Sequence, residues 1–224
     1  MYDRTIHWND LPTGNIVGFG REGLVLRLNE TESIKVYSPE RAMFAQQAMY
    51  NAEKLLGLGF LVPKPKEFVR INLCYGAKLP KFDYKHGLRL DSVSGSVRSV
   101  PAVIKEYFDG DGFGTIKPTF DQLKKLRSYL DRLDENDLSF YEGINLDYIA
   151  LKDGRVGLVD CTTLVSRENF DPLNGKFDYF DEAVSSYEGI VLDSLKQELR
   201  NNGHLDFSTH AKLFALSLYR TFKS

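Results

Sequence analysis

Alternating apolar and polar residues predict two consecutive strands near the start of the chain. The run Leu24–Leu28 alternates as a strand does, and Ser33–Tyr37 is rich in residues with high β-propensity. The polar residues 29–32 between them are typical of a turn. We therefore expect a strand, a turn and a second strand over residues 24–37.

A helical pattern follows directly. Ser38, Pro39 and Glu40 combine a hydroxyl N-cap, a proline at the first helical position and an acid in the first turn. The apolar residues that follow recur at helical spacing: Ala42, Met43, Ala45, Met49, Ala52, Leu55 and Leu56. Gly57 and Gly59 are typical of a helix end.

The middle of the chain is less regular. Residues 68–73 alternate as a strand does, whereas residues 76–99 are polar, rich in Gly and Ser, and predict no particular element. The second segment is basic through Lys78, Lys81, Lys85, Arg89 and Arg98. Two interpretations stay open for it: a contact with an acidic partner or a phosphate, and a solvated loop, which is the commoner role of such a stretch.

In the second half, periodicity predicts three helices, over residues 119–133, 180–199 and 208–222. Thr119 is expected to cap the first of them. Residues 148–160 predict a strand, an Asp-Gly hairpin turn and a second strand with Asp160 at its end. Residues 166–178 are expected to form a short polar loop.

Composition bounds the class of protein. The chain has 224 residues, 42% hydrophobic and 12% aromatic, enough for a core in one large domain or two lobes. A net charge of −2 predicts neither nucleic acid nor an anionic membrane as partner. Cys74 and Cys161 predict no metal cluster or disulfide framework, which favours a reducing, cytoplasmic setting. The sequence shows no signal region or membrane-spanning run, so we expect no membrane among the partners of the protein.

The candidate chemistry lies in the spacing of three glycines. Gly18, Gly20 and Gly23, with Val25 after them, fill every fixed position of the pattern G-x-G-x-x-G-x-V. A predicted strand follows the last glycine, whereas a dinucleotide-binding fingerprint has a helix there. Glycines let a backbone approach phosphate oxygens, and Lys35 on the next strand offers them a positive charge. The alternative is a glycine-rich hairpin with a solvated lysine.

These motifs resemble the protein-kinase-like superfamily over roughly residues 14–165, in the compact form of bacterial and phage kinases and kinase-like effectors. The resemblance implies an α+β, bilobal fold. Residues 1–110 would form a small antiparallel sheet with one helix, and residues 111–224 a reduced, mainly helical lobe. The boundary is expected near residues 109–115, where Gly110, Gly112 and Gly114 cluster.

The resemblance also implies roles for residues outside the glycine loop. Glu53 on the predicted helix would hold Lys35 against the α and β phosphates of ATP. Residues 100–110 resemble the last strand of a kinase small lobe as it enters the hinge. In that family the hinge backbone pairs with adenine, which implies this role for the Glu106 carbonyl and the Phe108 amide.

Asp160 resembles the metal-binding aspartate of D-F-G, here followed by Cys161 and Thr162. In the family this carboxylate holds Mg²⁺ on the phosphates, so the resemblance implies ATP and Mg²⁺ as cofactors. The alternative is a strand-end aspartate that caps a turn.

The catalytic loop fits the family in two registers. In one, Gly143 replaces the catalytic base and Tyr148 the second metal ligand, and neither can do the chemistry. In the other, Glu142 stands at the base position and Asp147 at the metal position. Asn145 adds a further oxygen ligand in either case.

The leading expectation is therefore a divergent kinase that transfers the γ-phosphate of ATP to a protein Ser/Thr hydroxyl. Its partner would be a protein substrate or a regulatory protein, in the cytoplasm, or in a host cytosol for a secreted effector. A pseudokinase that binds nucleotide without turnover is the alternative, and a small-molecule kinase of the same fold is a weaker one.

Overall fold

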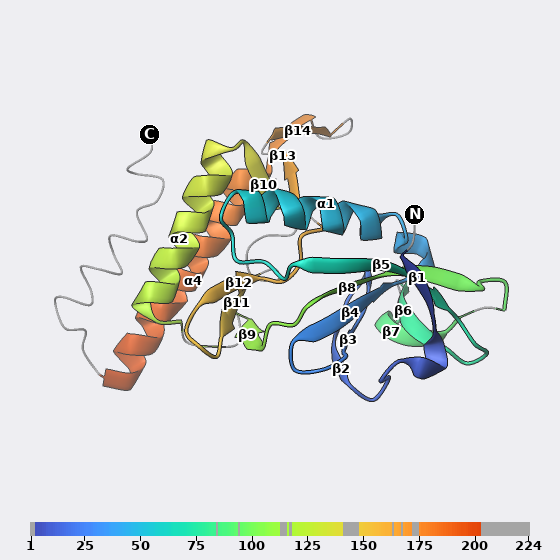
Figure 1. The fold of residues 1–224 in the computed structure, drawn as a ribbon. Coiled ribbons are helices and arrows are strands. Elements are labelled where there is room, and N and C mark those ends of the chain that lie inside the picture. Colours follow the sequence, from blue (N-terminus) through green and yellow to red (C-terminus); the bar gives the residue numbers. More distant parts are fainter. Residues whose placement is uncertain are drawn as a thin grey trace. The chain divides into compact units, whose positions relative to one another are not determined.

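The computed structural model describes residues 3–83, 85–93, 95–112, 116, 118–140, 148–162, 164–166, 168–171 and 175–202. The fold is mixed α+β, with a mainly β-sheet N-terminal part (Figure 1). The chain divides into two compact units, one made of residues 1–57 and 62–108 and the other of residues 58–61 and 109–224. The division after Phe108 lies close to the boundary expected after residue 110.

The first unit is built on a six-stranded sheet in the order β1-β5-β8-β4-β3-β2 (Figure 1). Its strands are β1 (Arg4–His7), β2 (Ile16–Phe19), β3 (Gly23–Arg27), β4 (Glu32–Tyr37), β5 (Pro65–Asn72) and β8 (Ser99–Glu106). β1 runs parallel to β5, and the other neighbours are antiparallel. The strands predicted from local alternation are confirmed as β3, β4 and β5.

Two parts of this unit were not predicted by local pattern. The side chains of β1 are mostly exposed, so no apolar alternation indicates this strand, and its partner β5 is distant along the chain. Residues 76–99 contain an antiparallel hairpin of β6 (Lys78–Asp83) and β7 (Gly87–Ser92). Leu79 of β6 is buried in the core of the unit, which explains how a polar segment is held in place.

The two faces of the sheet have different coverings. One face carries the main core, which includes Leu24, Leu26, Ile34 and Val36, with Trp8 from the short 3₁₀-helix η1 (Trp8–Asp10). Side chains alternate across a strand, so Lys35, between Ile34 and Val36, lies on the opposite face.

Helix α1 (Phe44–Gly57) packs on the face that carries Lys35. Its Phe44 and Ala45 belong to an apolar cluster with Tyr37 and Val103 of the sheet. The helical segment therefore covers the face of the sheet that carries the strand lysine, in the order that the sequence pattern predicts.

The start of the helical segment differs from the prediction. Residues 39–41 form a 3₁₀-helix, η2 (Pro39–Arg41), before α1, and the Ser38 side chain does not cap it. The Ser38 hydroxyl instead donates to the carbonyl oxygens of Arg21 and Glu22. A bond to the glycine loop has replaced the expected cap, because a tertiary acceptor lies within reach of the same hydroxyl.

The second unit contains α2 (Phe120–Glu135) and α4 (Tyr179–Asn202), which confirm two of the expected helices. Thr119 caps α2 as expected: its Oγ1 accepts from the Gln122 amide while the Gln122 side chain accepts from the Thr119 amide. The third expected helix, residues 208–222, lies outside the described residues.

Short strands complete this unit: β9 (Gly110–Gly112), β10 (Leu138–Phe140), β11 (Tyr148–Leu151), β12 (Val156–Leu158), β13 (Leu164–Ser166), β14 (Glu168–Asp171) and β15 (Gly175–Asp178). The β11–β12 hairpin confirms the predicted Asp-Gly turn, with Gly154 at a φ of 86°. The expected loop over residues 166–178 contains the β14–β15 hairpin instead, since antiparallel pairing satisfies the backbone of this polar stretch. β9, at the expected domain boundary, pairs with β11.

Residues 58–61 belong to the second unit through backbone contacts. The Leu61 amide donates to the Tyr129 hydroxyl at 3.1 Å, and that hydroxyl donates to the Val156 carbonyl at 3.1 Å. The Leu158 amide donates to the Leu61 carbonyl. Burial raises the pKa of Tyr129, whose ring stacks on Phe60. One phenol thus joins α2, the connecting segment and β12.

Tyr129→Phe is expected to destabilise the second unit by about 1–3 kcal/mol, because the Leu61 amide and the Val156 carbonyl each lose a partner away from water. Urea unfolding followed by the far-ultraviolet circular dichroism of the helices measures this loss. Tyr75→Phe is the matched control, since Tyr75 is fully exposed and should leave the midpoint unchanged. Equal midpoints for all three proteins would contradict the structural role of the phenol.

Candidate functional site

A single row of residues crosses four strands of the first unit. Gly18 of β2 lies opposite Val25 of β3, Val25 opposite Lys35 of β4, and Lys35 opposite Val103 of β8. Residues opposite one another share a face of the sheet. Three of the predicted site residues, Gly18, Val25 and Lys35, are thereby brought together on the face where α1 packs.

Lys35 is buried on this face and paired with a carboxylate. Its side chain is 8% exposed, and its Nζ lies 2.5 Å from Oε2 of Glu22, whose side chain is 19% exposed. The ammonium also lies 5.1 Å from the centre of the Tyr37 ring, which is a cation–π distance. The lysine is therefore not the solvated residue of the alternative interpretation.

The glycine loop is held at its tip. The Ser38 amide donates to the Glu22 carbonyl at 2.8 Å, and the Ser38 hydroxyl adds a second bond to the same oxygen at 3.3 Å. The Gly20 amide donates to the Gly23 carbonyl at 3.0 Å and closes the turn between β2 and β3. The backbone of the loop is thus fixed to the end of β4.

The three glycines have different surroundings. A Cβ on Gly23 would overlap the Val36 carbonyl oxygen and lie 2.9 Å from the Tyr37 Cα, so this glycine is required by strand packing. A Cβ on Gly18 or Gly20 would meet nothing within 4 Å. Packing does not explain the absence of a side chain at these two positions, which leaves the approach of a ligand as a reason for it.

Glu53, expected to hold Lys35, is exposed on α1 and has no ion pair with any residue that the structure describes. Glu22, a residue that sequence reasoning did not select, provides a carboxylate to Lys35. The register of β3 against β4 explains the pair: Gly23 lies opposite Tyr37, two residues after Lys35, so the tip of the loop comes near the lysine. The amino-acid pattern alone does not indicate this register.

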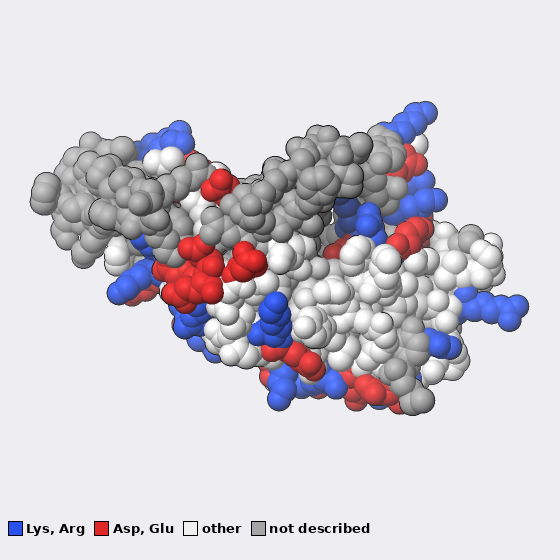
Figure 2. Space-filling model, turned by 90° about the horizontal axis from the view of Figure 1, so that it is seen from above, with Lys and Arg blue, Asp and Glu red and all other residues white. Residues whose placement is uncertain are grey.

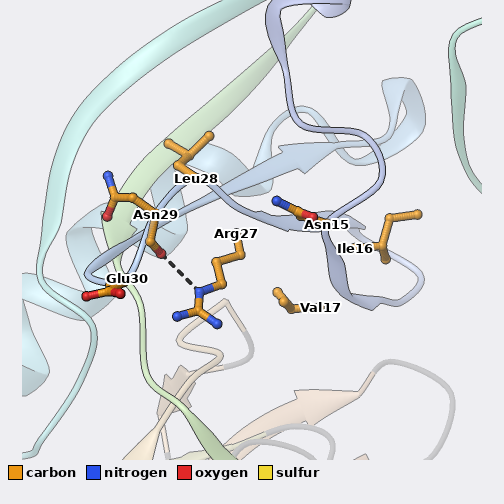
Figure 3. Close-up of a pocket in the computed structure, with 7 residues that line it drawn as sticks. All are labelled: Asn15, Ile16, Val17, Arg27, Leu28, Asn29 and Glu30. Atoms are coloured by element: carbon orange, nitrogen blue, oxygen red, sulfur yellow. Dashed lines mark hydrogen bonds between the residues drawn. The ribbon is translucent and has the colours of Figure 1, made fainter.

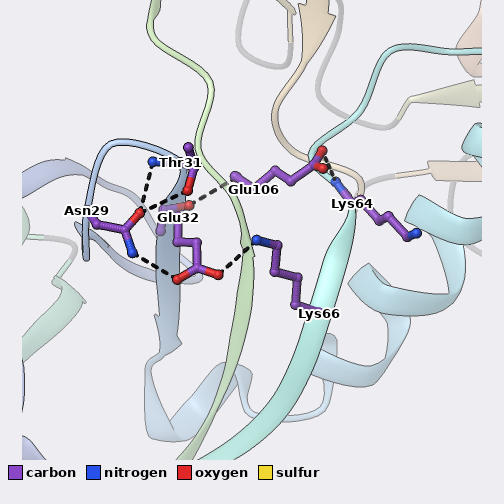
Figure 4. A network of polar contacts seen from close by, with 7 residues as sticks. Asn29, Thr31, Glu32, Lys64, Lys66 and Glu106 are labelled. Atoms are coloured by element: carbon purple, nitrogen blue, oxygen red, sulfur yellow. Dashed lines mark hydrogen bonds and ion pairs between the residues drawn. The ribbon is translucent and has the colours of Figure 1, made fainter.

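The predicted hinge residues lie at the end of β8 and just after it, and β8 pairs with β4 and β5. The Glu106 amide donates to the Lys64 carbonyl and its Oε2 accepts from the Lys64 amide, both at 3.1 Å (Figure 4). The Glu106 carbonyl accepts from the Ser33 hydroxyl at 3.3 Å. The Phe108 amide has no hydrogen bond within the described part of the chain.

A polar network surrounds this end of the sheet. Glu32 accepts from Lys66 at 2.8 Å and from the Asn29 side chain at 2.9 Å (Figure 4). The bond from Lys66, followed by that from Asn29, lowers the pKa of Glu32 below its ordinary value. This carboxylate therefore remains charged at neutral pH and fastens the β3–β4 turn to β5.

A pocket of about 410 Å³ lies beside the start of β2, next to the same turn (Figure 3). It is lined by Asn15, Ile16, Val17, Arg27, Leu28, Asn29 and Glu30. The Arg27 guanidinium donates to the Asn29 carbonyl at 3.1 Å and stacks 4.7 Å from the centre of the Tyr107 ring. Sequence reasoning did not find this pocket, because its residues come from two strands and a turn.

Asp160 follows β12 in the second unit and is half-buried. Its Oδ1 accepts from the Thr162 amide at 3.0 Å and from the Thr162 hydroxyl at 2.7 Å. This geometry caps a turn, as the alternative interpretation expects, and it also fixes the direction of the carboxylate. Both roles remain compatible with these two bonds.

The catalytic-loop residues Glu142, Gly143, Asn145 and Asp147 lie outside the described residues. Within the described ranges, no three His, Cys, Asp or Glu side chains gather as a metal site. Of the two predicted metal ligands, Asp160 and Asp147, only Asp160 lies within the described ranges.

Acidic and basic side chains of the described residues lie next to one another on the face drawn in Figure 2. No helix among those that the structure describes combines the length and apolar character needed to cross a membrane.

The chain matches no model of a known protein family and has no significant match among curated protein sequences.

Proposed function

We propose that the protein is a nucleotide-binding phosphotransferase of the protein-kinase type, which uses ATP and Mg²⁺. The observation that carries this proposal is the row of Gly18, Val25 and Lys35 across three neighbouring strands. A glycine loop over a strand with a buried lysine, followed by a helix on the same face, is the order of parts in a kinase small lobe.

Each residue of the row has a role that suits its surroundings. Gly18 and Gly20 present backbone with open space beside it, which suits contact with phosphate oxygens. Val25 offers an apolar surface for the base. Lys35 places a buried positive charge next to the loop, where it would bind the α and β phosphates. The Phe108 amide and the Glu106 carbonyl would donate to and accept from adenine.

Bound ATP·Mg²⁺ supplies the transferable γ-phosphoryl group. Asp160, with its carboxylate fixed by Thr162, is the residue that would hold Mg²⁺. Glu142 and Asp147 are the proposed base and second metal ligand. The acceptor proposed is a protein Ser/Thr hydroxyl.

A regulatory protein that binds nucleotide without turnover is the second candidate. The Lys35–Glu22 pair favours it, because an active kinase needs its strand lysine on the phosphates and a helix glutamate behind it. Glu53, at the position expected for that helix glutamate, is exposed. Turnover, rather than nucleotide binding, separates the two candidates.

The test combines binding with transfer. ATP·Mg²⁺ is expected to raise the melting temperature of the protein by mass action, and radiolabelled ATP to label a protein band. Asp160→Ala should abolish labelling. Asp153→Ala, at an exposed aspartate paired with Arg155, is the matched control and should label normally. A thermal shift without labelling supports the regulatory candidate, and no shift with any nucleotide overturns the proposal.

A further inference from the structure

The carboxylate of Glu22 is paired with the Lys35 ammonium, the group to which the proposed phosphates would bind. Lys35 Nζ is 2.5 Å from Glu22 Oε2, with only 8% of the lysine side chain exposed. A buried ammonium requires a counter-ion, and Glu22 provides it from within the glycine loop. A phosphate that approaches this ammonium therefore meets a carboxylate already there.

We infer that Glu22 is an autoinhibitory gate: its carboxylate takes the place of a nucleotide phosphate at Lys35 and must leave before the phosphate can bind. The inference depends on the proposed nucleotide site. It adds that the glycine loop carries its own competitor, which selects for ligands anionic enough to displace it.

The structure indicates how the gate would open. The Glu22 carbonyl is held by the amide and hydroxyl of Ser38, itself 1% exposed, so the loop backbone is fixed. The Glu22 side chain is 19% exposed and retains a path to solvent. Opening is therefore a rotation of one side chain, with no movement of the sheet.

The charge of a ligand determines whether its affinity depends on Glu22. Carboxylate and phosphate carry the same sign, and sharing one buried ammonium between them is unfavourable. Removing the Glu22 charge should therefore tighten binding of ATP. Adenosine has no phosphate and does not reach the ammonium, so its affinity should not depend on Glu22.

The experiment is isothermal titration of the full chain with ATP·Mg²⁺ and, separately, with adenosine. Glu22→Gln keeps the length and hydrogen-bonding capacity of the side chain and removes its charge. It is expected to bind ATP at least about fivefold more tightly than wild type, the lower end of typical couplings between two ligands. Adenosine affinity should be unchanged. Glu40→Gln, at an exposed glutamate of η2, is the matched control and should behave as wild type.

Glu22→Ser removes the same carboxylate with a different side chain and should give the same gain, with folding verified by circular dichroism. If wild type binds ATP and neither variant binds it more tightly, the gate is overturned while the nucleotide site stands. An equal gain for ATP and adenosine also overturns it, because the effect would not pass through phosphate. If neither wild type nor any of the variants binds nucleotide, the proposed function fails, and the gate fails with it.

Discussion

Gly23→Ala is expected to lower the stability of the first unit by about 3 kcal/mol, the upper end of typical overpacking costs. The added methyl group would overlap the Val36 carbonyl oxygen, and the Tyr37 Cα lies 2.9 Å away. Both are backbone atoms of β4, so neither can move aside without separating β3 from β4. The loop carried by these strands would lose its position together with the sheet.

Urea unfolding followed by tryptophan fluorescence measures this loss selectively. The chain has one tryptophan, Trp8, which is buried in the core of the first unit. Gly20→Ala is the matched control, since its methyl group meets nothing within 4 Å. Its free energy of unfolding should stay within about 0.5 kcal/mol of the wild-type value. A Gly23→Ala protein as stable as Gly20→Ala would contradict the strand packing described above.

Lys35→Ala is expected to lower phosphoryl transfer by at least about 100-fold, the typical cost of losing one preorganised group that stabilises transition-state charge. Alanine removes the buried positive charge and leaves Glu22 without its counter-ion. The remaining carboxylate then repels phosphate, so nucleotide binding should weaken as well. The measurements are the rate of labelling and the thermal shift with ATP·Mg²⁺.

Lys54→Ala provides the control for this variant. Lys54 is exposed on α1, and its loss changes the net charge by the same amount as the loss of Lys35. It should keep both the thermal shift and the labelling of wild type. A Lys35→Ala protein that retains full nucleotide binding would remove this lysine from the proposed site, whatever the state of the rest of the loop.

Part of the candidate site could be predicted from the sequence, because it depends on local order. The glycine spacing, the two strands and the turn between them all lie within residues 18–37. Once β2, β3 and β4 are adjacent, antiparallel pairing places Gly18, Val25 and Lys35 in one row. The pairing of Lys35 with Glu22 could not be predicted in this way, since family resemblance indicated a helix glutamate and Glu22 lies in the glycine loop.

The sequence by itself determined the elements whose signals are local: the hairpin turn at Gly154, the capping box of α2 at Thr119, and the β3–β4 unit. The tertiary structure alone decided that β1 pairs with β5, that residues 58–61 join the second unit, and that Glu22 faces Lys35. The physical reason is range. Turns and caps are hydrogen bonds between near neighbours in the chain, whereas strand partners and counter-ions are selected by the register between strands and by burial.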